Sequence, residues 1–164
     1  GGGVDTLFLA RTVGSRGCVH AFDVQQEALD RTRARLDAEA EGALAPVKLW
    51  LAGHERMAEL VPRERHGRVA AVMFNLGYLP GADRTVITRP DTTLAAMEAA
   101  LDLLAPRGVM TAVLYPGHEG GGEEADAVAA WASSLPAARA QTASYRFPQK
   151  PTAPYLIAIE RKFT

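Results

Sequence analysis

Short apolar runs alternate along the chain with longer segments in which apolar residues recur every three or four positions. The longer segments have the periodicity of helices, and the compact runs have the length of strands. Helices are predicted over residues 4–13, 25–41, 92–104 and 123–135, and strands over residues 18–22, 47–51, 69–74 and 109–115. This order predicts an open α/β sheet that binds ligands at the carboxyl ends of its strands.

Three apolar runs indicate how the strands of this sheet are arranged. Residues 69–74 are apolar without alternation, which predicts a parallel strand buried on both faces. The β-like runs 143–147 and 155–160 close the chain, and their spacing predicts an antiparallel pair at one sheet edge. The sheet is therefore predicted to be mostly parallel with a C-terminal antiparallel hairpin, within one domain over residues 1–164.

The chain opens on Gly1-Gly2-Gly3, a sequence that ordinarily follows a strand. We therefore expect the first strand of the sheet to be missing and the domain to be truncated at its N-terminus. The glycines predict either a tight turn or a close approach of the backbone to a ligand. A dinucleotide fingerprint would need glycine at Thr6, and Asp5 would repel a pyrophosphate at the helix start. Asp5 suits a cationic ligand end, such as the ammonium of a methionine.

Composition narrows the class of protein. The 164 residues are 48% hydrophobic and 23% charged, as in a globular domain with a sizeable core. A net charge of -1 argues against broad coating of nucleic acid but leaves room for a local basic patch. The single Cys18 suits a reducing, cytoplasmic location. No membrane span is expected, and no metal, because the histidines show no ligand spacing.

Polar residues gather at the predicted carboxyl ends of the strands: Asp23, His54, Glu55, Asn75, Tyr115 and His118. Asp23 comes about 20 residues after the glycines, as does the carboxylate that accepts ribose hydroxyls in α/β folds, although it could equally cap the next helix. His54-Glu55 could flank an adenine or cap a short helix.

Asn75 ends a buried strand and is followed by Leu76-Gly77-Tyr78-Leu79-Pro80-Gly81. The glycines and proline predict a shaped loop, which could be an ordinary turn. An asparagine oxygen can also accept from an amine N–H and so aim the nitrogen lone pair, while Tyr78 offers a flat face to a base. The stretch is thus compatible with an amine or base held at a strand tip.

Two later segments are compatible with binding roles. Residues 85–93 combine Arg89 and several hydroxyls, among them Thr92, before a helix, a pattern that suits phosphate or simple capping. Residues 115–122 run from Tyr115 through His118 to three glycines, which predicts a mobile lid or a plain connector.

With these residues in hand, the chain resembles the MnmM (YtqB-like) family, formerly called rRNA methylases, the bacterial tRNA 5-aminomethyluridine methyltransferases. The resemblance rests on 5–10, 21–25, 54–55, 74–81, 88–93 and the glycines around His118, and it covers nearly the whole chain. The run 74–81 is its most specific part. The chain departs from the family pattern at Gly2, where asparagine is usual, at Gly53, where serine is usual, and at Pro116, where histidine is usual.

The resemblance implies a Rossmann-like class I methyltransferase that uses S-adenosylmethionine to methylate the aminomethyl group of wobble 5-aminomethyl(-2-thio)uridine in the tRNA anticodon region. The implied cofactor residues are Gly1, Gly3, Asp5, Thr6, Asp23, Gln25, His54, Glu55 and Asn75. The implied substrate residues are Tyr78, Pro80, Gly81, Arg89, Thr92, Tyr115 and His118. Asn75, Tyr78 and His118 are the candidate catalytic residues, with His118 nominated as base.

Three alternatives remain from the residues. The first is a methyltransferase for rRNA or a small amine, and the second is a truncated cofactor-binding module without activity. The third is a nicotinamide oxidoreductase, which Asp5 and Thr6 disfavour. Dimerisation is left open by the sequence.

Overall fold

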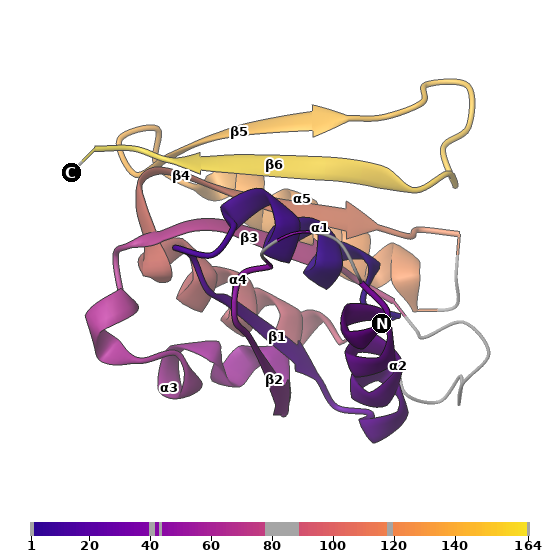
Figure 1. The fold of residues 1–164 in the computed structure, drawn as a ribbon. Coiled ribbons are helices and arrows are strands. Elements are labelled where there is room, and N and C mark those ends of the chain that lie inside the picture. Colours follow the sequence, from indigo (N-terminus) through magenta and orange to yellow (C-terminus); the bar gives the residue numbers. More distant parts are fainter. Residues whose placement is uncertain (1, 40–41, 43, 78–88, 118–119, 164) are drawn as a thin grey trace. The chain divides into compact units, whose positions relative to one another are not determined.

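The computed structural model describes residues 2–39, 42, 44–77, 89–117 and 120–163 (Figure 1). The described chain divides into two compact units, the first up to His54 and the second from Glu55 onward. The sheet is likewise described as two parts, with the strand orders β1-β2 and β3-β4-β6-β5.

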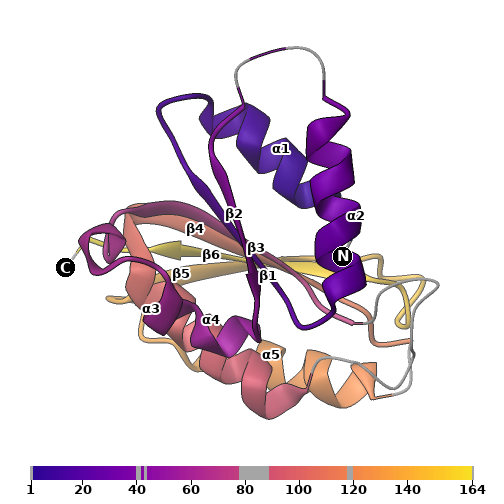
Figure 2. The ribbon, with the colours of Figure 1, turned by 60° about the horizontal axis from the view of Figure 1, so that its bottom comes forward.

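The first unit is a parallel strand pair covered by two helices. Its elements are α1 (Val4–Val13), β1 (Val19–Asp23), α2 (Gln26–Asp37) and β2 (Val47–Leu51). The strands pair in register from Val19 opposite Val47 to Asp23 opposite Leu51. Both helices lie on the same side of the pair (Figure 2). Ala10 of α1, Val19 and Ala45 form a small core that Leu36 of α2 joins, so apolar burial holds the helices to the strands.

The second unit carries the larger sheet and most of the core. Its elements are η1 (His54–Arg56), which begins on the last residue of the first unit, α3 (Met57–Leu60), η2 (Arg63–Arg65), β3 (Val69–Asn75), α4 (Pro90–Leu103), β4 (Leu104–Leu114), α5 (Gly121–Ser134), β5 (Ala140–Tyr145) and β6 (Tyr155–Arg161). β3 and β4 are parallel, and β6 runs antiparallel to both β4 and β5. The predicted C-terminal hairpin is therefore confirmed.

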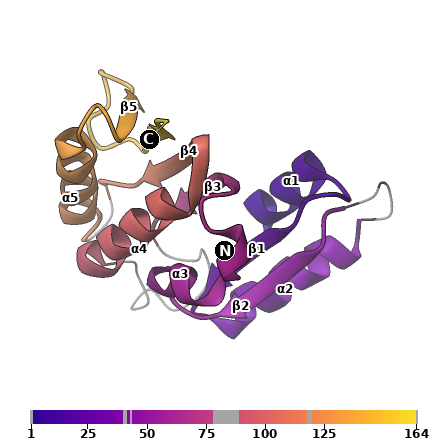
Figure 3. The ribbon, with the colours of Figure 1, turned by 90° about the vertical axis from the view of Figure 1, so that its left-hand side faces the viewer.

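Helices α4 and α5 cover one face of this sheet (Figure 3). Alternate residues of β4 and β6 point toward them and are buried: Met110, Ala112, Leu114, Tyr155, Ile157 and Ile159. This alternation follows from the period of two in strand side chains. Proline at the first position of α4 suits a helix start, because its missing N–H has no partner there.

Three of the differences between the structure and the predictions have a clear physical cause. α2 ends at Asp37 rather than at residue 41, because the Glu39 N–H turns to the Leu36 carbonyl, a tighter step that closes the helix. β4 begins at Leu104 and bulges past Arg107, which has a φ of 64°, so its register against β3 shifts. Only Phe74 of β3 is buried, because β3 pairs on one side alone among the described strands.

Candidate functional site

The tips of β1 and β2 lie side by side in the first unit. Asp23 stands opposite Leu51, and the Ala52 N–H donates to the Asp23 carbonyl over 3.0 Å, so the turn that leads to His54 starts beside Asp23. One carboxylate oxygen of Asp23 accepts from the backbone N–H of Gln25 at 3.0 Å. Gln25 itself, with extended backbone angles, is the N-cap of α2. Asp23 therefore orders the turn before the helix and is not its N-cap.

Gly3 is required by the approach of α1 to α2. Its φ is 77°, and a Cβ added there would lie 2.7 Å from the Cα of Thr32. A Cβ on Gly2 would meet nothing within 4 Å, so asparagine or glycine fits at that position. Arg35 of α2 donates from Nε to the Gly2 carbonyl over 2.7 Å and holds this segment.

Asp5 and Thr6 occupy the first turn of α1 and are half-buried. The acidic side chain therefore stands at the end of the helix where the helix dipole is positive. A carboxylate at the helix start disfavours the binding of a phosphate there. The expectation that this position suits an ammonium group rests on the same charge. Gly1 lies outside the described residues.

Asn75 ends β3, and Tyr115 directly follows the end of the neighbouring strand β4 in the second unit. Asn75 pairs with Val113, and the Leu76 N–H donates to the Val113 carbonyl over 3.1 Å. Leu76 is buried, whereas Asn75 is exposed at the sheet edge. Gly77 has a φ of 140°, and a Cβ added there would contact the Tyr115 ring at 3.7 Å. The structure thus brings Asn75, Gly77 and Tyr115 to one edge, as predicted.

Five predicted site residues lie outside the described residues: Gly1, Tyr78, Pro80, Gly81 and His118. Glu55 is exposed in η1, directly after the tip of β2. The α3 helix begins with Arg56 as its N-cap and no side-chain capping bond, so neither His54 nor Glu55 caps it.

The start of α4 shows what Arg89 and Thr92 do. Arg89 is the N-cap residue but makes no side-chain capping bond, and its carbonyl accepts from the Thr93 N–H at 2.9 Å. Thr92 donates its hydroxyl to the same carbonyl over 3.2 Å. The Arg89 guanidinium is 72% exposed and pairs with Asp91 at 3.3 Å. Such an exposed pair is worth little energetically, so the guanidinium is accessible to an anion.

A buried pair beneath this edge was missed by sequence reasoning. Thr93 donates its hydroxyl to a carboxylate oxygen of Glu124 over 2.6 Å, and both side chains are buried. The pair joins the first turns of α4 and α5, the helices that follow β3 and β4. One signal was present in the sequence, since Glu124 lies four residues before Val128 on the apolar face of its helix.

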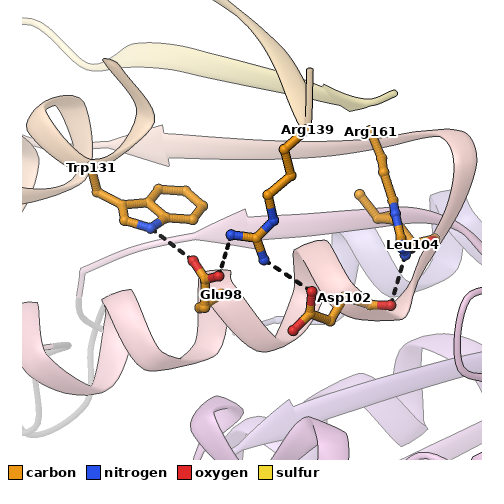
Figure 4. Close-up of polar contacts among 6 residues, drawn as sticks. All are labelled: Glu98, Asp102, Leu104, Trp131, Arg139 and Arg161. Atoms are coloured by element: carbon orange, nitrogen blue, oxygen red, sulfur yellow. Dashed lines mark hydrogen bonds and ion pairs between the residues drawn. The ribbon is translucent and has the colours of Figure 1, made fainter. Parts of the chain in front are cut away.

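A second polar network ties the far end of α4 to the hairpin (Figure 4). Arg139 contacts both Glu98 and Asp102, and the Trp131 Nε1–H donates to Glu98 over 3.0 Å. Burial lowers the pKa of Arg139, but hydrogen bonds and charge from Glu98 and Asp102 outweigh it and hold the pKa above its usual value. Arg161 donates to the Asp102 carbonyl over 2.8 Å. This network is structural, because it holds the last turns of α4.

Neither a metal nor a membrane site emerges from the described part of the chain. No three histidine, cysteine or acidic side chains there are grouped to hold a metal ion. Among the helices that the structure describes, none has the length and apolarity to cross a bilayer.

Comparisons with known proteins identify the family to which the chain belongs. A sequence model of the family described as "Putative rRNA methylase" matches residues 19–160. A relative from Arabidopsis thaliana, named tRNA (mnm(5)s(2)U34)-methyltransferase, chloroplastic, is 40% identical over 99% of this chain. The chain spans 61% of that relative's length.

Solved structures agree with this match. A structure from Clostridium thermocellum, described as a "putative rRNA-methylase", is 35% identical with a TM-score of 0.90, over 98% of this chain and 84% of that one. A "putative methyltransferase" of Streptococcus mutans, in complex with SAH, is also 35% identical, with a TM-score of 0.82 and the same coverage. The predicted Rossmann-like class I methyltransferase fold is thereby confirmed, and the chain belongs to the rRNA methylase family that the run at Asn75 had indicated.

Proposed function

We propose that this chain is an S-adenosylmethionine-dependent methyltransferase that acts on tRNA. Its substrate is the aminomethyl group of 5-aminomethyl(-2-thio)uridine at the wobble position, and its product is 5-methylaminomethyluridine. The observation that carries the proposal is the 40% identity, over 99% of the chain, to a relative named for this wobble uridine. The partner is accordingly the tRNA anticodon region.

The residues of the first unit fit S-adenosylmethionine. Asp23 supplies a carboxylate at a strand tip for ribose hydroxyls, with Gln25 and His54 beside it, and Asp5 suits the ammonium end. When bound, the cofactor supplies a methyl group on a sulfonium. A family member of 35% identity that was crystallised with SAH supports this choice of cofactor.

Asn75 is the residue that would orient the amine. Its side chain is exposed at the end of β3, where its oxygen can accept one amine N–H and leave the lone pair aimed outward. With the cofactor bound, the sulfonium would supply its methyl group to the neutral amine held by Asn75, and the methylated ammonium would then lose a proton to solvent. Positioning supplies most of the acceleration in such a displacement. His118 is our candidate for the base that takes the proton from the alkylammonium substrate.

The test compares acceptors. The protein is incubated with labelled S-adenosylmethionine and either tRNA that lacks this methyl group or ribosomal RNA. Label in the tRNA, recovered as 5-methylaminomethyluridine after nucleoside digestion, is expected. Label in ribosomal RNA alone, or in a small amine alone, would overturn the substrate.

The second candidate is a cofactor-binding module without activity. The chain spans 61% of the length of its Arabidopsis relative, so transfer activity is tested separately from cofactor binding. Calorimetry separates the candidates when combined with the acceptor assay, since cofactor binding without label transfer would support the module. The cytoplasmic location stays a prediction, and that relative is named as chloroplastic.

A further inference from the structure

The hairpin that joins β5 to β6 carries an exposed cluster of two aromatic and two basic side chains: Tyr145, Phe147, Arg146 and Lys150. We call these four residues the hairpin patch. Tyr145 is 65% exposed and Phe147 is 51% exposed. No acidic residue occurs between positions 141 and 155, so the segment is locally positive in a chain of net charge -1.

The two aromatic rings of the hairpin patch are ordered against each other. Tyr145 and Phe147 pack edge to face, with centroids 5.6 Å apart and planes at 79°. Large exposed rings are costly to leave in water, whereas an ordered ring offers a flat surface for a partner at little entropic cost. Surfaces that bind single-stranded nucleic acid combine aromatic rings, on which bases stack, with neighbouring basic side chains. The hairpin patch has both.

Arg146 is anchored by the core beneath it. Its guanidinium carbon lies 3.6 Å from the ring centroid of Tyr155. Tyr155 is buried, and its hydroxyl donates to the Ala125 carbonyl over 3.1 Å. In the part of the chain that the structure describes, neither Arg146 nor Lys150 forms an ion pair with an acidic side chain. Both cations are thus available to an anion.

A cavity of about 210 Å³ lies within the same hairpin. Arg146, Phe147 and Lys150 line it together with Pro148 and Pro151. The two prolines restrict the backbone of the loop that lines the cavity. A phosphate and part of a base match this mixture of cationic and apolar walls.

The hairpin patch lies at the same end of the strands as Asn75 and Tyr115, the end at which β3, β4 and β5 all finish. β5 and β4 both run antiparallel to β6, so they share one direction, and Tyr145 and Leu114 end at adjacent β6 positions, Leu156 and Tyr155. The loop after β4 also touches the hairpin, since a Cβ added to Gly117 would lie 2.9 Å from the Thr152 carbonyl oxygen. A strand of RNA whose modified base reaches Asn75 can therefore continue onto the hairpin.

We propose that the hairpin patch binds the single-stranded RNA that flanks the methylated nucleotide. Tyr145 and Phe147 stack on a base, and Arg146 and Lys150 contact phosphates. This inference rests on the proposed function, which supplies an RNA loop as the substrate. It adds a contact surface separate from the residues that hold cofactor and amine.

The test measures affinity of the full chain for a fluorescent anticodon stem-loop by anisotropy. Replacing both rings, Y145A with F147A, is expected to weaken binding roughly 5- to 150-fold, the effect of losing one stacked base. K150A is expected to weaken binding and to reduce the salt dependence by about one phosphate contact. The matched controls are F163A, an equally exposed ring, and K162A at the opposite end of the hairpin.

Each other result is decisive. Equal affinities for the wild type, the double variant and the controls would overturn the inference, as would a wild type that binds no RNA. Loss of a dimer on sedimentation, with unchanged RNA affinity, would assign the hairpin patch to a protein interface and overturn it too. Calorimetry with S-adenosylmethionine checks that variants fold. If the wild type binds the stem-loop but transfers no methyl group, the proposed function fails while this inference stands.

Discussion

The hydroxyl of Thr93 and the carboxylate of Glu124 lie 2.6 Å apart in the interior of the second unit, and they join the first turns of two helices. Those helices follow the loops that leave β3 and β4, the strands that end at Asn75 and just before Tyr115. The bond therefore fixes the spacing of the two segments on which the candidate substrate residues are carried.

Thr93→Val tests this bond. Valine has nearly the shape of threonine but cannot donate, so the buried carboxylate loses a partner, at an expected cost of about 1–3 kcal/mol in the free energy of unfolding. Urea unfolding followed by circular dichroism measures the change. Thr93→Ser keeps the donor and is the control; if serine and valine destabilise equally, packing rather than hydrogen bonding explains the loss.

Gly3→Ala should be far more damaging than Gly2→Ala. At Gly3 the new methyl group meets the α2 backbone at 2.7 Å and the positive φ is strained, whereas Gly2 faces open space. We expect a loss of roughly 1–3 kcal/mol in unfolding free energy at Gly3 and near zero at Gly2. Thermal unfolding reads the stability, and calorimetry reads S-adenosylmethionine affinity. Equal effects at both positions would contradict the close approach of α1 to α2.

Stability should fall at alkaline pH through Tyr155. Burial raises the pKa of Tyr155 above its usual 10.0, opposed in part by Arg146. Tyr155 therefore loses its phenolic proton at a lower pH in the unfolded chain than in the folded protein. Its contribution to the free energy of unfolding is complete below pH 10.0 and is lost as the pH rises through the pKa of the folded state.

Tyr155→Phe checks that dependence. The variant should lose roughly 0.5–1.5 kcal/mol at neutral pH with the Ala125 hydrogen bond, and its stability should decline less steeply above pH 10. Denaturant titrations at several pH values measure both. A variant with the same alkaline slope as the wild type would show that other groups cause the decline. Tyr145→Phe, at an exposed tyrosine, is the control.

Asn75→Ala should impair methyl transfer with little effect on folding. The side chain is exposed, so its removal leaves no buried cavity, yet the amine loses its orienting acceptor. We expect single-turnover methylation to slow by about 10²-fold, the usual effect of a misplaced reactant. Unchanged turnover, measured at saturating cofactor, would remove Asn75 from the mechanism.

His118→Ala tests the candidate base separately. If His118 accepts the substrate's proton, the variant's methylation rate should fall near neutral pH and recover at higher pH, where the free amine is populated without help. Rates at saturating substrate across pH 6–10 give the profile. An unchanged rate with an unchanged profile would exclude the role.

The apolar pattern predicted most elements within a few residues, because strand runs and helical faces are local properties. β2 has the predicted bounds, β1 is shifted by one residue at both ends, and β3 extends one residue beyond its predicted end. The start of β4 was missed because Pro106 and Gly108 read as breakers, whereas the structure absorbs them in a bulge held by the neighbouring strand.

Only those parts of the candidate site that lie at the ends of strands could be predicted from the sequence. Asn75 and Tyr115 meet because parallel strands end at the same edge, which topology alone dictates. The bond between Thr93 and Glu124 joins residues 31 apart, and no spacing rule encodes such a contact. Helix capping, the alternative role considered for Asp23, does not occur, because the chain takes one more extended residue, Gln25, before α2 begins.

β6 follows every other described strand along the chain, yet it lies between β4 and β5. Neither neighbour can complete its hydrogen bonds until residues 155–161 have left the ribosome, so the sheet of the second unit is completed only after this segment is made. Until then β4 exposes a long unpaired edge of apolar residues, a template for aggregation. A chain that stopped before residue 155 would still contain the candidate residues Asn75 and Tyr115. It would lack β6, the strand that joins β4 to β5.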